Sequence, residues 1–208
     1  MRGLLIAAFT ASVLGAGGCR TVRIAAPVDL RTYSKTDSAM SKEIQPFLPI
    51  AWLRLPPDWK TEFTGYGPPY DDLPFPEMVF WNQEGTYGGG VFYVGDEDIE
   101  SIRKHELHDG FGKNIDAPSL ARTRIDGRDA FIIRGHFSAW DDMERTTFQS
   151  MLRTYHFAGG DVAMAVVPLN VPPHVTFVVV VVSAPGLLSR DPARAFEIFA
   201  TCRFRKAP

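Results

Sequence analysis

Two histidines and an aspartate in the sequence HELHDG have the residue types and the spacing of metal ligands. His105 and His108 lie three residues apart on a predicted helix, so their imidazoles share one face, and Asp109 follows directly. This group predicts a zinc site of the kind that hydrolases use. The sequence lacks a His-Glu-x-x-His pattern and shows no evident third ligand. The alternative is a polar helix end, where histidine and lysine interact favourably with the negative end of the helix dipole.

His136 and Arg134 form a second candidate site, because they share one face of a predicted strand. A hydrolase would use the imidazole as a base. Ser138 lies on the same face but roughly 7 Å further along the strand, which is too far for a nucleophile to contact its base. The sequence has no Gly-x-Ser-x-Gly turn either. The alternative is a solvated sheet face.

Aromatic and acidic residues gather in segments rich in glycine and proline between residues 60 and 90. Rigid aromatic loops offer contact area at a low entropic cost, so they often form binding surfaces. The alternative is that these rings cover one end of the sheet. The residues of the expected binding surface are Tyr66, Tyr70, Asp71, Asp72, Trp81 and Tyr87.

Three consecutive glycines, Gly88 to Gly90, precede a predicted strand and lack the lysine of a phosphate-binding loop. They predict a turn and a bulge. The acidic pairs lack the regular spacing of a calcium loop. We therefore expect no cofactor.

Residues 1–18 have the pattern of an export signal. Arg2 supplies a short positive region, Leu4 to Leu14 form an uncharged apolar run, and small residues follow up to Gly18. A membrane-spanning helix needs about 20 apolar residues, and this run is shorter. The segment therefore predicts a signal peptide.

Gly17, Gly18 and Cys19 resemble the lipobox of bacterial lipoproteins, although Ala16 stands where that family usually has leucine. The resemblance implies that Cys19 carries diacylglycerol on its sulfur and becomes the mature N-terminus. The membrane would then be a partner through this lipid, in the cell envelope, and we expect the periplasmic face of the outer membrane rather than the inner membrane. The alternative is ordinary cleavage and secretion, which leaves a Cys19–Cys202 disulfide open.

The composition suits one soluble-type domain behind this leader. The chain has 208 residues and a formal net charge of −2, which argues against a nucleic-acid partner because such proteins need a basic face. Residues 19–46 lack sustained periodicity and predict a flexible tether, with a root-mean-square span of roughly 25–30 Å. Residues 47–208 form the predicted domain.

The domain alternates strand and turn signals. Asp126–Gly127 between two strand-like runs predicts a hairpin, and residues 145–158 with 161–169 predict a second one. In the strand after Asp126–Gly127 we expect Phe131 and Ile133 on a buried face, and Arg128, Arg134 and His136 on a wetter one. The run VTFVVVVVSAP predicts a central strand that is covered on both faces. Further strands are expected at 50–55, 78–82 and 90–94, and helices at 96–108 and 189–204.

The sum is an α+β fold, a mostly antiparallel sheet of about seven or eight strands covered by two helices in an α/β/α sandwich. This order, with Leu55, Pro56 and Trp59 near its start and an aromatic C-terminal helix running into Cys202 and Phe204, resembles the PsbP-type fold over residues 47–206. The resemblance implies a non-catalytic assembly or accessory module, frequently on a lipoprotein, and brings no catalytic residues.

The leading hypothesis is therefore an envelope lipoprotein that binds a protein or glycan partner without chemistry. A second hypothesis is a secreted or periplasmic hydrolase or metal-binding enzyme that uses His105, His108 and Asp109, or His136 with Arg134. A third is a structural protein whose tether holds a complex at the membrane.

Overall fold

The computed structural model describes residues 22–33, 40–45, 51–63, 78–94, 115–137, 159–169 and 176–205. The predicted signal peptide, Cys19 and the predicted helix at 96–108 lie outside these ranges.

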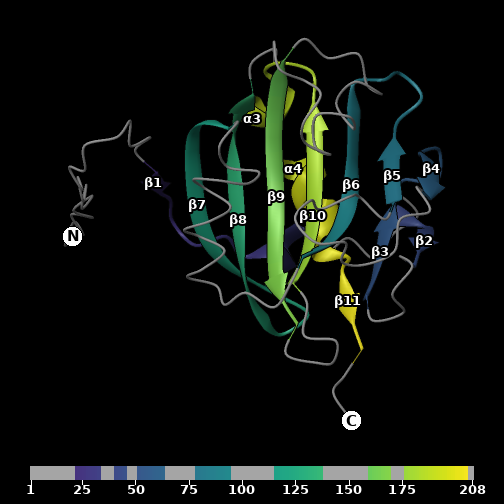
Figure 1. Cartoon of the computed structure of the whole chain (residues 1–208), viewed down its shortest axis with the longest axis horizontal. Helices are drawn as coiled ribbons and strands as arrows, with labels where there is room; N and C mark the ends of the chain where they lie inside the picture. The colour runs from purple at the N-terminus through teal and green to yellow at the C-terminus, as the bar shows by residue number, and fades with distance from the viewer. Residues whose placement is uncertain are drawn as a thin grey trace, which may run out of the picture.

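An eight-stranded sheet in the order β1-β7-β8-β9-β10-β6-β5-β4 dominates the described part of the chain (Figure 1). All neighbouring strands are antiparallel except β1, which pairs with β7 in parallel. The predicted α+β class with a mostly antiparallel sheet is confirmed. The strands are β1 (Arg23–Ile24), β4 (Lys60–Phe63), β5 (Met78–Trp81), β6 (Tyr87–Val94), β7 (Asp116–Ile125), β8 (Arg128–Phe137), β9 (Gly160–Pro168) and β10 (Thr176–Ser183).

A smaller sheet in the order β11-β3-β2 packs beside the first one. Its strands are β2 (Lys42–Ile44), β3 (Ala51–Leu55) and β11 (Arg203–Phe204). Leu53 and Leu55 of β3 are fully buried in the same core as the large sheet. The short sheet therefore closes one side of that core.

The valine-rich strand β10 lies at the centre of the fold. Every residue from Thr176 to Ser183 is buried. Val179 and Val181 contribute to the core under the helices, whereas Val178 and Val180 contribute to the core on the opposite face. The prediction of a strand covered on both faces is confirmed, because only a strand with two dry faces tolerates an unbroken apolar run.

Two helices follow β10, α3 (Leu187–Arg190) and α4 (Ala193–Ala200). Asp191 lies between the two helices, and its side chain accepts a hydrogen bond at 3.0 Å from the amide of Ala193, the first residue of α4. Phe196 and Phe199 are buried against the sheet, as predicted. The helix ends earlier than expected, because the Thr201 hydroxyl donates to the Ile198 carbonyl at 2.7 Å and closes the last turn. The chain then becomes strand β11.

The predicted hairpin at Asp126–Gly127 joins β7 and β8. Asp126 has φ +49° and Gly127 has φ +79°, as a two-residue hairpin turn of the I′ type requires. The Asp126 carboxylate also accepts a hydrogen bond from the Phe204 amide at 2.9 Å. The turn therefore holds the C-terminal strand in place as well.

Strand β8 differs from the expected pattern of one buried and one wet face. Phe131 and Ile133 are buried on one face, but Ala130 and Ile132 are buried on the other face, beneath α4. The accessible residues of that face are Arg128 at one end of the strand and Arg134 and His136 at the other. An interior strand covered by a helix has no solvent side except where the helix ends.

The second predicted hairpin would pair β9 with residues 145–158, which lie outside the described ranges. Strand β9 pairs with β8 along one edge and with β10 along the other. It therefore has no free edge for a strand formed by residues 145–158. Strand β8 precedes β9 in the chain and β10 follows it. The local sequence does not show that these two strands, rather than residues 145–158, are the partners of β9.

Gly88, Gly89 and Gly90 lie inside strand β6 rather than in a turn or bulge. They pair in unbroken register with β5 and β10. The ring of Phe80 lies over Gly89, so that a Cβ at Gly89 would overlap that ring and the Val180 carbonyl oxygen. Gly89 therefore makes room for an aromatic ring in the core.

The described parts of the predicted tether, residues 22–33 and 40–45, pack on the domain. Strand β1 pairs with β7, and the 3₁₀ turn η1 (Leu30–Tyr33) lies against α4, with the Tyr33 and Phe196 rings in edge contact at 5.1 Å. Leu30 and Met40 are buried. Single apolar side chains contact the domain here, and they form no periodic pattern in the sequence. The sequence therefore shows no sign that this segment packs on the domain.

Candidate functional site

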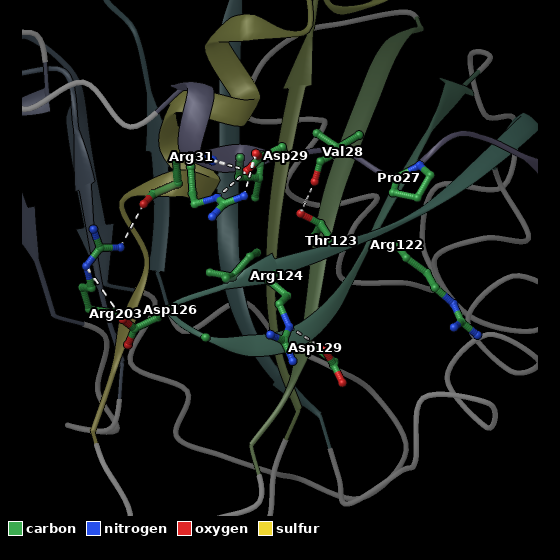
Figure 2. Close-up of a pocket in the computed structure, with 14 residues that line it drawn as sticks. Pro27, Val28, Asp29, Arg31, Arg122, Thr123, Arg124, Asp126, Asp129 and Arg203 are labelled. Carbon is green, nitrogen blue, oxygen red and sulfur yellow. Dashed lines mark hydrogen bonds and ion pairs between the residues drawn. The ribbon is translucent and has the colours of Figure 1, made fainter. Parts of the chain in front are cut away.

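A cavity of about 850 Å³ opens beside the hairpin of β7 and β8 (Figure 2). Its walls come from the segment before and within η1, from β7 and its turn, and from the C-terminal end of α4. The lining residues include four arginines and three aspartates: Arg31, Arg122, Arg124 and Arg203, and Asp29, Asp126 and Asp129.

The path of the chain after β1 creates this cavity. The Val28 amide donates to the Arg122 carbonyl at 3.0 Å, and the Thr123 hydroxyl donates to the Val28 carbonyl at 2.7 Å. At Asp29 the chain turns away from β7 into η1. The end of β7 and its turn are thus left uncovered beside a short polar loop.

Ion pairs order most of the charged side chains. Arg31 donates to both carboxylate oxygens of Asp29, at 2.9 and 3.0 Å, and this contact holds the pKa of Asp29 below its ordinary value. Arg124 contacts Asp129 at 3.0 Å, and Arg203 lies 4.0 Å from Asp126. The Arg31–Asp29 and Arg124–Asp129 pairs are largely exposed. Exposed pairs are weak, so an incoming anion can exchange with either aspartate.

Arg122 differs from the other three arginines. It forms no ion pair with any residue that the structure describes, and in Figure 2 it points away from the other labelled side chains. The described lining contains no serine, cysteine or histidine. Guanidinium groups are the donors that suit carboxylates and phosphates. The cavity is therefore equipped to bind an anionic group.

A second polar site joins His136 to the buried Asp161. The His136 Nδ1 atom lies 2.7 Å from an Asp161 carboxylate oxygen, and the Ser189 amide donates to the other oxygen at 2.7 Å. The side chain of Asp161 is 3% exposed and that of His136 is 55% exposed. Burial by itself raises the pKa of Asp161, but the hydrogen bonds from Ser189 and His136 outweigh it and lower the pKa.

Sequence reasoning did not select Asp161. The available signal was an aspartate at the start of a strand whose other residues are almost all apolar. Such a position buries a charge, and a buried charge needs partners. The predicted pair of His136 with Arg134 is not formed, because the Arg134 guanidinium lies over the Phe196 ring at 5.6 Å.

The two described residues of the predicted aromatic surface lie on opposite faces of the large sheet. Tyr87 packs on the core beneath the helices and stacks on Trp59, with ring centroids 6.2 Å apart. Trp81 packs on the core of the other face. Adjacent residues in a strand point to opposite faces, and the register of β5 with β6 separates these two rings. Tyr66, Tyr70, Asp71 and Asp72 lie outside the described residues.

The predicted metal ligands His105, His108 and Asp109 also lie outside the described residues. Within the described ranges, no three histidine, cysteine or acidic side chains are grouped as a metal site would require. The same ranges contain no helix long and apolar enough to cross a membrane.

Cys202 is a buried free thiol. It is fully inaccessible, its sulfur lies 3.8 Å from the Ile198 carbonyl, and burial raises its pKa to about 12. A disulfide from Cys202 to Cys19 would require the end of α4 to leave the core.

We expect Cys202 to be unreactive in the folded protein. In a Cys19→Ser chain it is the single thiol, and a thiol-reactive reagent such as an aromatic disulfide should titrate it only after denaturation, because the thiolate is the reacting form. Titration with and without denaturant measures this. Rapid labelling of the native protein would contradict the buried position.

Comparison with known proteins identifies the fold. No protein-family model and no curated protein matches this chain. The solution structure of cyanobacterial PsbP (CyanoP) from Synechocystis sp. PCC 6803 is similar with a TM-score of 0.52 over 82% of this chain and 95% of that one. The fold is PsbP-like. The sequence identity is 8%, so the likeness shows the fold alone.

Two weaker similarities accompany this PsbP-like match. LpqN, described as involved in cell envelope biogenesis of Mycobacterium tuberculosis, has a TM-score of 0.47 and 13% identity over 86% of this chain and 99% of that one. The Ran-binding protein Mog1p of Saccharomyces cerevisiae has a TM-score of 0.44 and 12% identity over 79% and 96%. Scores at this level carry no functional argument.

Proposed function

We propose that this chain is an envelope lipoprotein, anchored through acylated Cys19, whose PsbP-like domain binds an anionic partner without chemistry. The observation that carries the binding role is the arginine-lined cavity. Its described walls offer guanidinium donors and contain no serine, cysteine or histidine. A protein or glycan that presents carboxylate groups is the partner that this chemistry fits. The anchor is supported by the small residues before Cys19 and by the burial of the other cysteine.

The anchor is tested by the intact mass and the membrane partition of the protein made in a bacterial host, beside a Cys19→Ser chain. We expect a diacylglycerol-sized mass on the protein and loss of membrane association in the variant. A mature chain without added mass would overturn the anchor and indicate secretion.

The binding role is tested with fluorescent hexaglutamate and hexagalacturonate as probes, and with maltohexaose as the uncharged control. We expect at least one anionic probe to bind and the Arg124→Gln variant to bind it about five- to tenfold more weakly, because one charge-assisted contact is lost. Arg54→Gln is the matched control, since Arg54 also forms one exposed ion pair, with Glu43 at 3.5 Å, but in the smaller sheet. Equal binding by the two variants would contradict a site in this cavity.

A second candidate function is hydrolysis, favoured by the imidazole of His136, which a buried carboxylate orients at 2.7 Å. An oriented histidine of this kind can act as a general base. The metal-dependent form of this alternative uses His105, His108 and Asp109. Stoichiometric zinc in the purified protein, with turnover that His136→Ala or His105→Ala abolishes, would favour the enzyme over the binding module.

A further inference from the structure

The folded domain begins almost directly after the proposed lipid attachment point. Val22 already packs on the core of the large sheet, and Arg23 begins strand β1. Cys19 and Val22 are three residues apart, so their Cα atoms are separated by at most about 11 Å. The sequence suggested a flexible tether of roughly 25–30 Å. The segment between Cys19 and β1 is too short to form it.

This short link limits where an anchored domain can lie. The polar headgroup region is about 5–8 Å thick on each side of the hydrocarbon core. A lipid on Cys19 sits at the inner boundary of that region. Strand β1, which is at one edge of the large sheet (Figure 1), consequently has to lie at or beside the headgroups.

The side chains at this edge suit an anionic lipid surface. Ile24 is 66% exposed, and among the described residues Phe63 is the other large apolar side chain that is exposed. By the parallel register of β1 with β7, Ile24 lies opposite Leu120 and therefore on the same face as Arg122. Arg23 lies next to it on the other face. These three residues, Arg23, Ile24 and Arg122, are called the β1 edge below.

No acidic side chain among the described residues pairs with the arginines of the β1 edge. Neither Arg23 nor Arg122 forms an ion pair with a residue that the structure describes, and both are exposed. Residues 22–28 of the edge segment and residues 118–125 of β7 contain no acidic side chain. Basic residues close to a membrane are attracted by anionic headgroups, and an exposed isoleucine between them can enter the interface.

We infer that the β1 edge rests on the anionic phospholipid headgroups of the membrane that holds the anchor. The domain is thus held in one orientation, with β1 toward the bilayer and β4, at the other edge of the sheet, away from it. This inference rests on the proposed acylation of Cys19. It adds a binding surface for phospholipid to the proposed partner site in the neighbouring cavity.

The orientation is tested by photo-cross-linking from two matched positions. Ile24 and Phe63 are both large, apolar and exposed, at 66% and 54%, and they lie on the strands at opposite edges of the same sheet. A benzophenone amino acid is placed at each position in turn, in the chain anchored in vesicles of phosphatidylglycerol and phosphatidylcholine. We expect a lipid adduct, seen by mass, from position 24 and not from position 63. Equal adducts, or an adduct from position 63 alone, would overturn the inference.

Two ways of attaching the chain to the vesicles test the anchor proposal and the orientation proposal independently. In one arm the chain carries the lipid added by the bacterial host. In the other arm the mature chain from residue 19 is coupled through its Cys19 thiol to a maleimide phospholipid. If the host adds no lipid but the coupled chain still gives adducts from position 24 alone, the anchor proposal fails and the lipid-facing edge stands. If the host does add the lipid but the acylated chain gives equal adducts from positions 24 and 63, the anchor proposal stands and the lipid-facing edge fails.

The contribution of the arginines to membrane binding is tested with a chain that carries no lipid anchor. The mature chain with Cys19→Ser is sedimented with phosphatidylglycerol vesicles and with phosphatidylcholine vesicles. We expect preference for the anionic vesicles, and a loss of about fivefold in partition for each of Arg23→Gln and Arg122→Gln. The control pair is Arg54→Gln and Lys60→Gln, which remove exposed cations from the smaller sheet and from β4. Equal losses in the two pairs would show a net-charge effect and overturn the specific role of the β1 edge.

Discussion

Replacing Gly89 with alanine is expected to lower the free energy of unfolding by about 3 kcal/mol or more. A Cβ at this position overlaps the Val180 carbonyl oxygen and the Phe80 ring. Gly89 lies between two paired strands, so the backbone of β10 cannot move away without breaking the ladder at the centre of the sheet. Domains of this size are stable by only about 5–15 kcal/mol, so one methyl group removes a large part of that stability.

Urea denaturation followed by tryptophan fluorescence measures this loss, with Gly85→Ala as the control. Gly85 has φ +64° and no atom near the position of an added Cβ. Its replacement costs only the left-handed backbone conformation, about 1–2 kcal/mol. If Gly89→Ala were no more destabilising than Gly85→Ala, the close contact between Phe80 and β6 would not exist in solution.

Asp161→Ala is expected to cost about 2–3 kcal/mol at neutral pH. The Asp161 carboxylate is buried and accepts hydrogen bonds from Ser189 and His136, so its removal takes both bonds away and leaves the Ser189 amide without this partner. Asp161 also connects β9 to the helix α3 that follows β10. The variant should therefore loosen the contact between the sheet and the C-terminal helices.

The contribution of Asp161 should depend on pH with a definite sign. The folded state lowers the pKa of Asp161 below its ordinary value of 3.8. A lowered pKa means that the ionised carboxylate stabilises the fold above pH 3.8, and that this stabilisation is lost as the pH falls through the folded pKa. The difference in unfolding free energy between the wild type and Asp161→Ala should accordingly be constant from pH 7 to 5 and shrink below about pH 4.

Asp129→Ala is the matched control for this prediction, because Asp129 also contacts a basic side chain but is 75% exposed. An exposed ion pair contributes at most about 1 kcal/mol, so this variant should keep nearly the stability of the wild type. A loss at Asp161 no larger than that at Asp129 would mean that the buried hydrogen bonds at Asp161 do not form.

Local chemistry predicted several elements correctly. Asp126 and Gly127 favour positive φ angles, and the hairpin turn at these positions needs nothing from distant residues. The valine run of β10 is too apolar to have a wet face, so its central place follows from composition. The burial of Phe196 and Phe199 follows from the local pattern of a C-terminal helix. These features are local, and together they indicate the outline of the PsbP-like fold, a sheet with a buried central strand and a C-terminal helix.

Other features required the arrangement of distant segments. The partners of β9 lie on either side of it in the chain, so the sequence suggested a hairpin that the sheet does not contain. The glycine run predicted a bulge, whereas Gly89 lies in a regular strand because the Phe80 ring occupies the space that a side chain would fill. Asp161 gained its partners only when His136 and Ser189 were brought beside it from 25 and 28 residues away.

The candidate sites divide in the same way. By itself the sequence determined the export signal pattern, the Cys19 context, the near-neutral charge and the strand-rich class, because each depends on residue types within a short window. Only the tertiary structure decided that residues 22–33 pack on the domain and that Arg31, Arg124 and Arg203 line one cavity. The physical reason is that both depend on side chains far apart in the chain, whose contacts no local period records.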